Sequence, residues 1–255
     1  MGRKMDVIIN ADDLGISQEV NEAVFDLAGE GLITSATIIA NGPNVDEACQ
    51  RLGEFPGCSF GVHLNVTEFT PISGPEKLEP LLDSQGRFDA TKIRRAPVDS
   101  MLKDGIFREF TAQIEKLKAL GLDLSHIDSH FHVHTIPWMF PVLKKLQRKF
   151  QIRRVRIRGS FGSQANIRRS RRLLVNAYNF GLRNYYRTTT AHGFLNFETF
   201  HNRLLNNELT HKTVEVMVHP GSHTFNHEKE ITMLRGPWRD ETIEQLRLIN
   251  YRQLG

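Results

Sequence analysis

The stretch Val7-Ile8-Ile9-Asn10-Ala11-Asp12-Asp13-Leu14-Gly15-Ile16-Ser17 joins a strand of buried type to two adjacent carboxylates. Its β-branched start predicts a strand that ends at the acidic pair, and Ser17 suits the start of a helix. Two neighbouring carboxylates resist ionisation unless a cation or hydrogen-bond donors offset their charge. An Asx turn with a helix N-cap would also explain a lone pair of aspartates. Histidines further along the chain favour a functional explanation instead.

The length and composition restrict the class of protein. A chain of 255 residues suits one β/α barrel or two small domains. Hydrophobic residues make up 40% and charged residues 24%, as in ordinary globular proteins. No apolar run approaches the ~18 residues of a transmembrane helix, and we expect no secretory signal peptide. Because Cys49 and Cys58 follow no metal-binding spacing and fit a reducing compartment, we expect a cytoplasmic protein.

Strand-like and helix-like segments alternate along the chain. We expect strands at Val7–Asn10, Ser35–Ala40, Ser59–Val66, Ser125–Val133, Arg154–Ile157 and Thr213–Val218. We expect helices at Gln18–Glu30, Val45–Leu52, Lys103–Leu120, Pro141–Phe150, Ile167–Leu182 and Glu241–Tyr251. This alternation indicates an α/β fold with a largely parallel sheet, open or closed into a barrel, in one domain over residues 1–255. The segment Glu68–Pro97 lacks periodicity, and we expect an insertion or a lid there.

Polar side chains gather at the carboxyl ends of the expected strands. In a β/α barrel, the active site forms at these ends, so side chains from separate strands meet at one mouth. The residues at these positions are Asp12, Asp13, Asn41, His63, Asn65, His130, Arg158 and His219. No single one of them indicates a site, whereas the set does.

Histidines alternate in the segment Asp128-Ser129-His130-Phe131-His132-Val133-His134. If it is extended, its four ionisable side chains share one face. A lone half-buried histidine is usually a hydrogen-bonded core residue, but four such groups are costly to bury without a cation. Imidazole and carboxylate ligands suit zinc, cobalt, manganese or iron, whereas magnesium prefers oxygen. Three protein ligands with open positions would indicate a catalytic metal site.

The net charge of +4 hides an uneven distribution, because no acidic residue lies between Asp128 and Glu198. Such a block attracts anions, including phosphate, nucleic acid and anionic lipid. A solvated basic face, with interior arginines paired to acids elsewhere, is the alternative. Since the block has no recognisable nucleic-acid-binding motif, we expect no nucleic-acid partner. Its basic residues are Lys144, Lys145, Arg148, Lys149, Arg153, Arg154, Arg156, Arg158, Arg168, Arg169, Arg171, Arg172, Arg183 and Arg187.

Five motifs in order, Asn10–Gly15, Gly31–Thr37, Gly61–Asn65, His126–His134 and Val216–Gly221, resemble those of the YdjC-like carbohydrate deacetylase family. The resemblance implies a distorted (β/α) TIM-like barrel of the glycoside hydrolase and deacetylase type. It also implies hydrolysis of N-acetyl groups from acetylated amino sugars, in an oligosaccharide or a lipid-linked glycan. Residues 153–211 match the family least.

The resemblance further implies one divalent metal ion held by Asp13, His63 and His130. The family is reported to use Mg²⁺, whereas the ligand chemistry favours Zn²⁺ or a similar ion. Phe131 departs from the family, many of whose members have histidine there. We expect its side chain to point away from the metal.

The remaining site residues are expected to transfer protons, contact the substrate or orient the metal ligands. Asp12 is expected to act as the general base, with basicity favoured by the adjacent Asp13, and His219 as the general acid. Candidate substrate contacts are Asn41, Asn65 and Arg158. Residues expected to surround and orient the ligands are Asp128, His132 and His134.

Two other functions compete with deacetylation. A metal-dependent phosphoesterase would explain the basic block and Arg158, and a noncatalytic, metal-stabilised glycan- or lipid-binding protein would explain the metal site alone. Arginines at 168, 169, 171 and 172 beside an apolar stripe also suit a helix lying on anionic lipid, which would place the protein at the inner membrane face. The alternative is a barrel helix with Leu and Val facing the core and the arginines facing water. A homodimer is left open.

Overall fold

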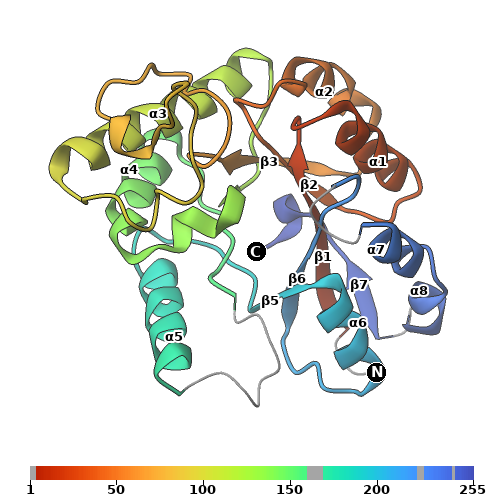
Figure 1. Ribbon diagram of the computed structural model, residues 1–255. Helices are drawn as coiled ribbons and strands as arrows, with labels where there is room; N and C mark the ends of the chain where they lie inside the picture. Colours follow the sequence, from red (N-terminus) through yellow and green to blue (C-terminus); the bar gives the residue numbers. More distant parts are fainter. Residues whose placement is uncertain (1–3, 160–168, 223–226, 243–244) are drawn as a thin grey trace.

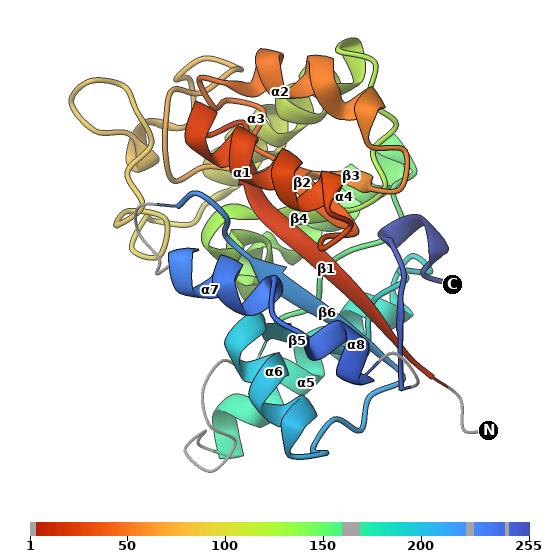
Figure 2. The ribbon, with the colours of Figure 1, turned by 90° about the vertical axis from the view of Figure 1, so that its right-hand side faces the viewer.

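The computed structural model describes residues 4–159, 169–222, 227–242 and 245–255. A parallel sheet curls at the centre of the molecule and helices surround it, as Figures 1 and 2 show. The strand order is β4-β3-β2-β1-β6-β5, with β7 paired to the beginning of β1. The strands are β1 (Met5–Leu14), β2 (Ser35–Ile38), β3 (Ser59–Leu64), β4 (Ile127–Ser129), β5 (Gly193–Asn196), β6 (Thr213–Val218) and β7 (Leu246–Leu248). The predicted distorted TIM-like barrel is confirmed.

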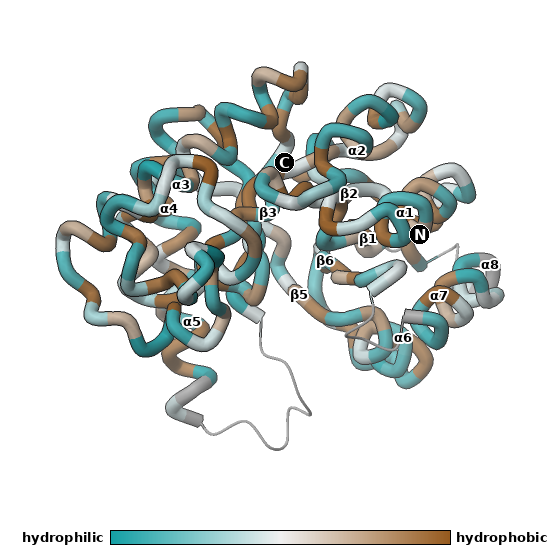
Figure 3. Tube along the Cα trace, turned by 45° about the horizontal axis from the view of Figure 1, so that its top comes forward, coloured by the Kyte–Doolittle hydropathy of each residue, from teal (hydrophilic) through white to brown (hydrophobic). Residues whose placement is uncertain are grey.

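Helices follow the strands in chain order and pack around the sheet. They are α1 (Gln18–Gly29), α2 (Val45–Arg51), α3 (Ser100–Ala119), α4 (Phe140–Phe150), α5 (Arg169–Asn184), α6 (Phe197–Leu205), α7 (His227–Leu234) and α8 (Trp238–Thr242). Short 3₁₀ turns are η1 (Leu52–Glu54), η2 (Glu79–Leu81), η3 (His130–Thr135), η4 (Pro137–Met139) and η6 (Tyr251–Gln253). Hydrophobic and hydrophilic residues alternate along the outer helices (Figure 3), as expected where one face packs on a core. None of the described helices combines the length and the apolar character needed to cross a membrane.

Strand β1 lies at the centre of the sheet, which explains its apolar sequence. Every residue from Val7 to Leu14 is buried, and the strand pairs with β2 on one side and β6 on the other. The register shifts between Ala11 and Leu14, and Asp13 has φ +69°. Such a bulge interrupts the alternation of side chains, so two adjacent carboxylates reach neighbouring partners at the carboxyl end of the sheet.

Residues 68–97 lie at the end of the sheet toward which β1 points (Figure 2). Leu78, Leu81 and Phe88 are buried in the core. The backbone N–H groups of Ile72 and Ser73 donate to the Glu109 carboxylate of α3, at 3.1 and 2.8 Å. The segment is therefore packed on the barrel, and its movement as a lid stays a prediction.

The expected strand over residues 125–133 is wrong beyond Ser129. Strand β4 ends there, and η3 follows with left-handed backbone at Phe131 (φ 48°) and His132 (φ 54°). Because the chain turns, Asp128, His130, His132 and His134 do not share the face of an extended strand. The alternation of histidines in residues 128–134 is typical of a strand, but the chain forms a tight turn there.

Two other expected elements also differ. The predicted helix over residues 241–251 is wrong, because α8 ends at Thr242 and Leu246–Leu248 form β7 against β1. The expected strand Arg154–Ile157 is reduced to single parallel bridges, Ile127 to Val155 and Arg154 to Thr189. In both segments, pairing with residues distant in sequence overrides the local pattern.

Candidate active site

Three side chains suited to metal binding converge from three elements at the carboxyl end of the sheet. Asp13 comes from the bulge of β1, His63 from β3 and His130 from the start of η3. The Asp13 Oδ1 atom lies 3.3 Å from His63 Nε2 and 2.8 Å from His130 Nδ1. The described residues thus place one carboxylate and two imidazoles, all buried, within reach of a single ion.

Asp128 on β4 holds the His63 ring from behind. Its Oδ1 atom lies 2.6 Å from His63 Nδ1, so the opposite nitrogen faces Asp13. The Thr37 hydroxyl on β2 donates to Asp128 Oδ2 at 3.1 Å. A carboxylate behind an imidazole fixes the ring orientation and increases the electron density on the nitrogen that can bind metal. The expected position of Asp128 beside a ligand histidine agrees with this geometry.

Arg156 lies at the centre of a buried carboxylate network. Its guanidinium forms a bidentate pair with Asp12, with both N···O distances 2.6 Å. It also contacts Asp128 Oδ2 at 2.7 Å and Glu215 Oε1 on β6 at 2.7 Å. Asn10 Nδ2 donates to Asp12 Oδ1 at 2.9 Å. Asp12 is therefore held rigidly from two sides.

Carboxylates outnumber arginines among the described residues of this interior. Asp12, Asp128 and Glu215 share the guanidinium of Arg156, whereas Asp13 faces the imidazoles of His63 and His130. Unpaired buried charge costs several kcal/mol, so a divalent cation would stabilise this arrangement.

The geometry of Asp13 fits such an ion. Although two imidazoles lie within ion-pair distance of Asp13 Oδ1, no N–H of the described residues is aligned to donate a hydrogen bond to it. A buried oxygen and two ring nitrogens that converge without hydrogen bonds have the arrangement expected of metal ligands. The donor set of one oxygen and two nitrogens fits zinc-like ions better than magnesium.

The pKa values of the two histidines also favour a cation at this place. Burial opposes the charged form of His63, but Asp128 and Asp12 raise its pKa to about 10. For His130, the nearby carboxylates of Asp13 and Glu68 overcome burial and raise the pKa to about 9. The two imidazoles attract protons because the surrounding carboxylates attract positive charge. A metal ion would displace these protons on binding.

The environment of Asp12 differs from the expectation in one respect. Burial raises the pKa of Asp12, but the paired Arg156 guanidinium more than offsets this, so the pKa lies below its usual value. The expected increase in basicity from the adjacent Asp13 is therefore wrong, because the side chain of Arg156 lies closer and carries the opposite charge. Asp12 is a carboxylate kept ionised and fixed in place.

His219 approaches the same carboxylate from the end of β6. Its Nε2 atom lies 3.9 Å from Asp12 Oδ2. The backbone N–H of His219 donates to Glu230 of α7 at 2.7 Å, which fixes the strand end. Burial lowers the pKa of His219. A cavity of about 310 Å³ adjoins the ring and includes Asn196, Met217 and Met233, so His219 borders open space large enough for part of a sugar.

Asn41 and Asn65 hold the chain near the site. Asn65 Nδ2 donates to Asn41 Oδ1 at 3.0 Å and to the Glu68 carbonyl at 2.9 Å. Asn41 Nδ2 donates to the same carbonyl at 3.2 Å. These contacts place the Glu68 carboxylate 3.7 Å from His130 Nε2. Both amides are used within the protein, so the structure gives them a positioning role, and substrate contact by either stays a prediction.

His132 and His134 occupy different places after the turn. His134 Nε2 lies 3.1 Å from the backbone carbonyl of Arg156, and its backbone N–H donates to the Ser129 hydroxyl at 2.9 Å. The His132 ring stands edge-on to Phe194, with 5.5 Å between centroids. His134 thus holds the backbone of Arg156, whereas His132 packs beside the network.

Arg158 lies away from the carboxylates. Its backbone N–H donates to Asn179 of α5 at 2.9 Å, and its side chain lines a separate cavity with Arg172 and Arg203. In the expected strand, Arg156 is the arginine that enters the site. The sequence could not distinguish Arg156 from Arg158, because Arg154, Arg156 and Arg158 alternate along one expected strand and its end, and no acid lies nearby in the sequence.

Sequence reasoning also missed Glu215 and Tyr251. The Tyr251 hydroxyl donates to Glu215, and its ring stacks on His126 with 3.5 Å between centroids. The backbone N–H of Tyr251 donates to the hydroxyls of Ser35 and Ser59, at 3.2 and 3.0 Å. Glu215 could have been found in the sequence, because it lies inside the apolar strand Thr213–Val218. A buried acid needs a partner, so this position indicated a buried polar network.

The outer face of α5 contradicts the simple barrel-helix alternative. Val175, Tyr178 and Leu182 face the core, but Leu173 is 69% exposed and Phe180 is 68% exposed. Leu173 and Leu174 therefore face water, whereas Val175 and Leu182 face the core as that alternative expects. Arg168 lies outside the described residues, as do the side chains of Arg169 and Arg171, so the predicted cluster of four arginines cannot be placed.

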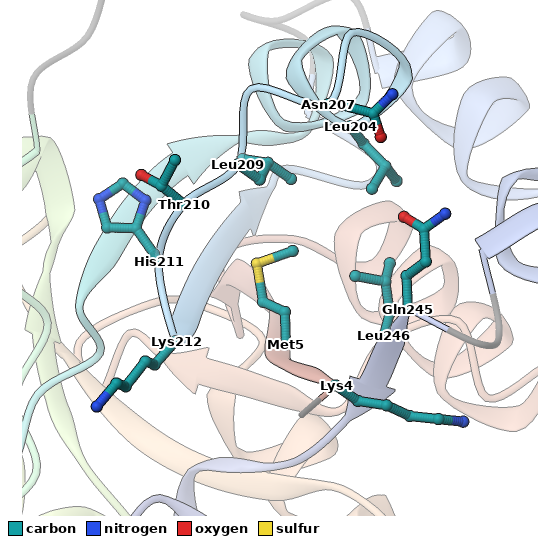
Figure 4. Close-up of a pocket in the computed structure, with 10 residues that line it drawn as sticks. All are labelled: Lys4, Met5, Leu204, Asn207, Leu209, Thr210, His211, Lys212, Gln245 and Leu246. Atoms are coloured by element: carbon teal, nitrogen blue, oxygen red, sulfur yellow. The ribbon is translucent and has the colours of Figure 1, made fainter. Parts of the chain in front are cut away.

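A different cavity, of about 400 Å³, lies at the amino ends of β1 and β6 (Figure 4). Met5, Leu204 and Leu246 contribute apolar side chains, and Lys4 and Lys212 flank it. The carboxylates and imidazoles of the site lie at the opposite ends of these strands. This cavity is separate from the catalytic candidate.

Comparison with known proteins shows the family of the chain. The sequence profile described as "YdjC-like protein" matches residues 6–245. The chain belongs to the YdjC-like family. A YdjC-like relative from Brevibacillus brevis named "Carbohydrate deacetylase" is 32% identical over 85% of this chain and 81% of its own length. A protein of the same name from Oceanobacillus iheyensis is 30% identical over 90% of this chain and 96% of its own length.

Solved structures support the YdjC-like fold. A protein from Enterococcus faecalis, described as a putative cellobiose-phosphate cleavage protein, superposes with a TM-score of 0.80 over 99% of both chains at 24% identity. The Xyl-CE4 domain of a multidomain xylanase from a termite hindgut metagenome (Trinervitermes trinervoides) reaches a TM-score of 0.50 at 11% identity. It covers 98% of this chain and 89% of its own. Both comparisons concern the fold alone.

Proposed function

We propose that this YdjC-like protein is a metal-dependent hydrolase that removes N-acetyl groups from acetylated amino sugars. The observation that carries the proposal is the convergence of Asp13, His63 and His130 beside the buried Asp12 and His219. The relatives named carbohydrate deacetylase support the same reaction class. A noncatalytic binding protein would have no need for a further carboxylate and imidazole, those of Asp12 and His219, beside a metal site.

Asp13, His63 and His130 would hold the cation. A bound divalent ion would supply Lewis acidity, which stabilises negative charge on the acetyl oxygen and increases the acidity of water. The donor set leads us to propose a zinc-like ion, with Mg²⁺ as the alternative suggested by family resemblance. The shared placement of Asp128 and Thr37 behind His63 would keep this ligand oriented during turnover.

The remaining chemistry belongs to Asp12 and His219. Asp12 would accept a proton from the attacking water, since Arg156 keeps its carboxylate ionised and Asn10 fixes one oxygen. His219 would deliver a proton to the departing amine through Nε2, the atom that lies 3.9 Å from Asp12 Oδ2. The 3.9 Å separation would place both groups side by side, within reach of the water and the nitrogen of the same acetamido group.

The sugar would lie over the mouth of the barrel. Phe131, where the resemblance expected histidine in many members, is half exposed, and its ring centroid lies 4.5 Å from that of His130. An exposed aromatic face beside the reaction centre suits packing against a sugar ring. The cavity beside His219 would receive a neighbouring part of the substrate. We place the enzyme in the cytoplasm, where Cys49 and Cys58 would stay reduced.

Acetate release tests this proposal. Purified protein is stripped with a chelator, reloaded with one metal at a time, and incubated with N-acetylated oligosaccharides and lipid-linked amino sugars. We expect acetate only with metal present, with Zn²⁺, Co²⁺ or Mn²⁺ exceeding Mg²⁺. The same preparations are assayed with phosphorylated sugars. Release of phosphate without acetate would establish the phosphoesterase instead.

A further inference from the structure

The barrel has a seam between residues 156–159 and β5. Closer to the amino ends of the strands, the bridge between Arg154 and Thr189 still joins the two segments. Beyond it, β5 pairs with β6, and no backbone hydrogen bond between described residues connects β5 to residues 156–159. Helix α5 covers the seam, and a cavity of about 310 Å³ remains beneath it.

This seam cavity has an apolar floor and a basic rim. Its floor includes Ile157, Val175 and Phe194, all buried. The cationic and imidazole side chains that line it are Arg158, Arg172, Arg203, His192 and His211. No carboxylate lines the cavity within the described part of the chain, and none of the three arginines forms a salt bridge with a described residue.

Three guanidinium groups without acids are suited to a phosphate group. Each guanidinium offers a planar set of donors that matches two phosphate oxygens. Unpaired arginines at the edge of a cavity give a positive potential that concentrates anions. His211 responds to the same field, because burial and the nearby Arg203 both lower its pKa. An uncharged sugar alone would make little use of this rim.

Phe194 separates the seam cavity from the catalytic carboxylates. Its ring centroid lies 4.7 Å from Arg156 Cζ, and the same ring contacts His132. A ligand in the seam would therefore lie one side chain away from the network that holds Asp12. This proximity connects the cavity to the substrate of the neighbouring site.

We propose that the seam cavity binds a phosphate group, held by Arg158, Arg172 and Arg203. The group belongs either to a soluble sugar phosphate or to a phospholipid headgroup. The statement that this phosphate is part of the substrate rests on the proposed deacetylase function. Phosphate binding by the cavity does not depend on that function. The exposed Leu173, Leu174 and Phe180 on the outer face of α5 provide apolar contact for a lipid surface.

Direct binding measurements test the proposal without turnover. Inorganic phosphate and N-acetylglucosamine 6-phosphate are titrated calorimetrically into the metal-loaded and the chelator-treated protein at low salt. We expect binding in both states. The single variants Arg158→Gln and Arg203→Gln should each weaken it about tenfold, as expected for one charge-assisted hydrogen-bonding group. Arg153→Gln removes an exposed arginine outside the cavity and should leave it unchanged.

A second experiment distinguishes the two sources of phosphate. Cosedimentation compares vesicles of phosphatidylcholine with vesicles that also contain phosphatidic acid. Binding to the anionic vesicles that is lost in Arg158→Gln/Arg203→Gln but kept in Arg153→Gln supports the lipid headgroup. Binding of the soluble sugar phosphate with no vesicle binding supports the soluble source.

Several results would overturn the seam site. One is phosphate binding that disappears with chelator but survives both arginine substitutions, since this places phosphate on the metal. Another is no detectable binding of any phosphate probe. Thermal unfolding confirms that each variant is folded. Hydrolysis of an uncharged N-acetylated oligosaccharide, measured in Arg203→Gln, should be unchanged, so failure of phosphate binding and failure of deacetylation give separate results.

Discussion

The charges of the carboxylate network are buried and paired, whereas those of the basic segment between residues 129 and 197 include exposed arginines with no acid nearby in the sequence. In the network, Asp12, Asp128 and Glu215 surround one guanidinium with almost no access to water. In the basic segment, Arg153 and Arg172 lie exposed and no acid occurs in the sequence. Among the described residues, Arg156 is the arginine that belongs to the basic segment by sequence and to the network by position.

The number of charges along a sequence therefore says little about how much each charge contributes to stability. An exposed arginine loses little hydration and contributes little to stability. A buried arginine must be fully hydrogen bonded, and its removal leaves its partners unpaired. Substitutions in the two regions should therefore have very unequal effects.

The largest effect is expected at the metal ligands. Asp13→Ala, His63→Ala and His130→Ala should each abolish bound metal and activity, because each removes one of three ligands that converge on one point. Elemental analysis after gel filtration measures the metal. Full occupancy in His130→Ala would mean that the ligand set is wrongly assigned.

Substitution of Arg156 is expected to have the next largest effect. Arg156→Met leaves three buried carboxylates without their cation and should lower the free energy of unfolding by about 3–5 kcal/mol. The matched control is Arg153→Met, an exposed neighbour, which should change it by less than about 1 kcal/mol. Urea unfolding measures both. Equal stability of the two variants would contradict the charged network.

The proton-transfer groups come third. Asp12→Asn should keep the metal but lower kcat about a hundredfold or more, the range expected on loss of a general base. His219→Ala should lower kcat by a similar factor with the metal content unchanged. Acetate release and elemental analysis are measured on the same samples. Loss of metal in proportion to activity would make either residue a ligand instead.

The smallest effect concerns the pH dependence of stability at Glu215. Burial raises the pKa of Glu215 to about 7, above its usual value near 4.5. The folded protein then holds this proton more tightly than the unfolded chain, so its contribution to stability is complete below about pH 4.5 and is lost as the pH rises through 7. Glu215→Gln cannot titrate and does not lose this contribution. As the pH rises from 4.5 to above 7, its free energy of unfolding should therefore increase relative to that of the wild type by about 1–3 kcal/mol.

Chemical unfolding of the metal-free proteins at several pH values from 4.5 to 8 measures this difference. Tyr251→Phe, which removes the hydroxyl that donates to Glu215, is the companion variant. It should steepen the loss of stability with rising pH. A constant difference between wild type and Glu215→Gln across the range would show that the carboxyl does not titrate there.

Much of the barrel was predictable because its signals are local. The apolar runs around Val7 and Val214 predicted central strands, and helical periodicity with the Ser17 cap predicted α1. The site residues were predictable as a set because parallel strands carry their carboxyl ends to the same edge. Where a strand depends on distant partners, as β7 does, the sequence alone indicated a helix.

The errors within the site have a common physical origin. The alternation around His132 looked like a strand, but left-handed backbone at Phe131 and His132 turned the chain. Arg156 was hidden among equivalent arginines, because only the three-dimensional register decides which of them faces the interior. The pKa of Asp12 was misjudged for the same reason, since its nearest charge comes from a residue far along the chain.

Tyr251 lies far beyond Asp12 in the sequence, yet the two are linked through Glu215 and Arg156. A ribosome delivers these residues in the order 12, 156, 215 and 251, so the first carboxylate emerges long before its last indirect partner. Domains complete their packing only when the required segments have emerged. We therefore expect nascent chains that stop short of Tyr251 to expose the acidic interior and to need protection from aggregation until synthesis passes this point.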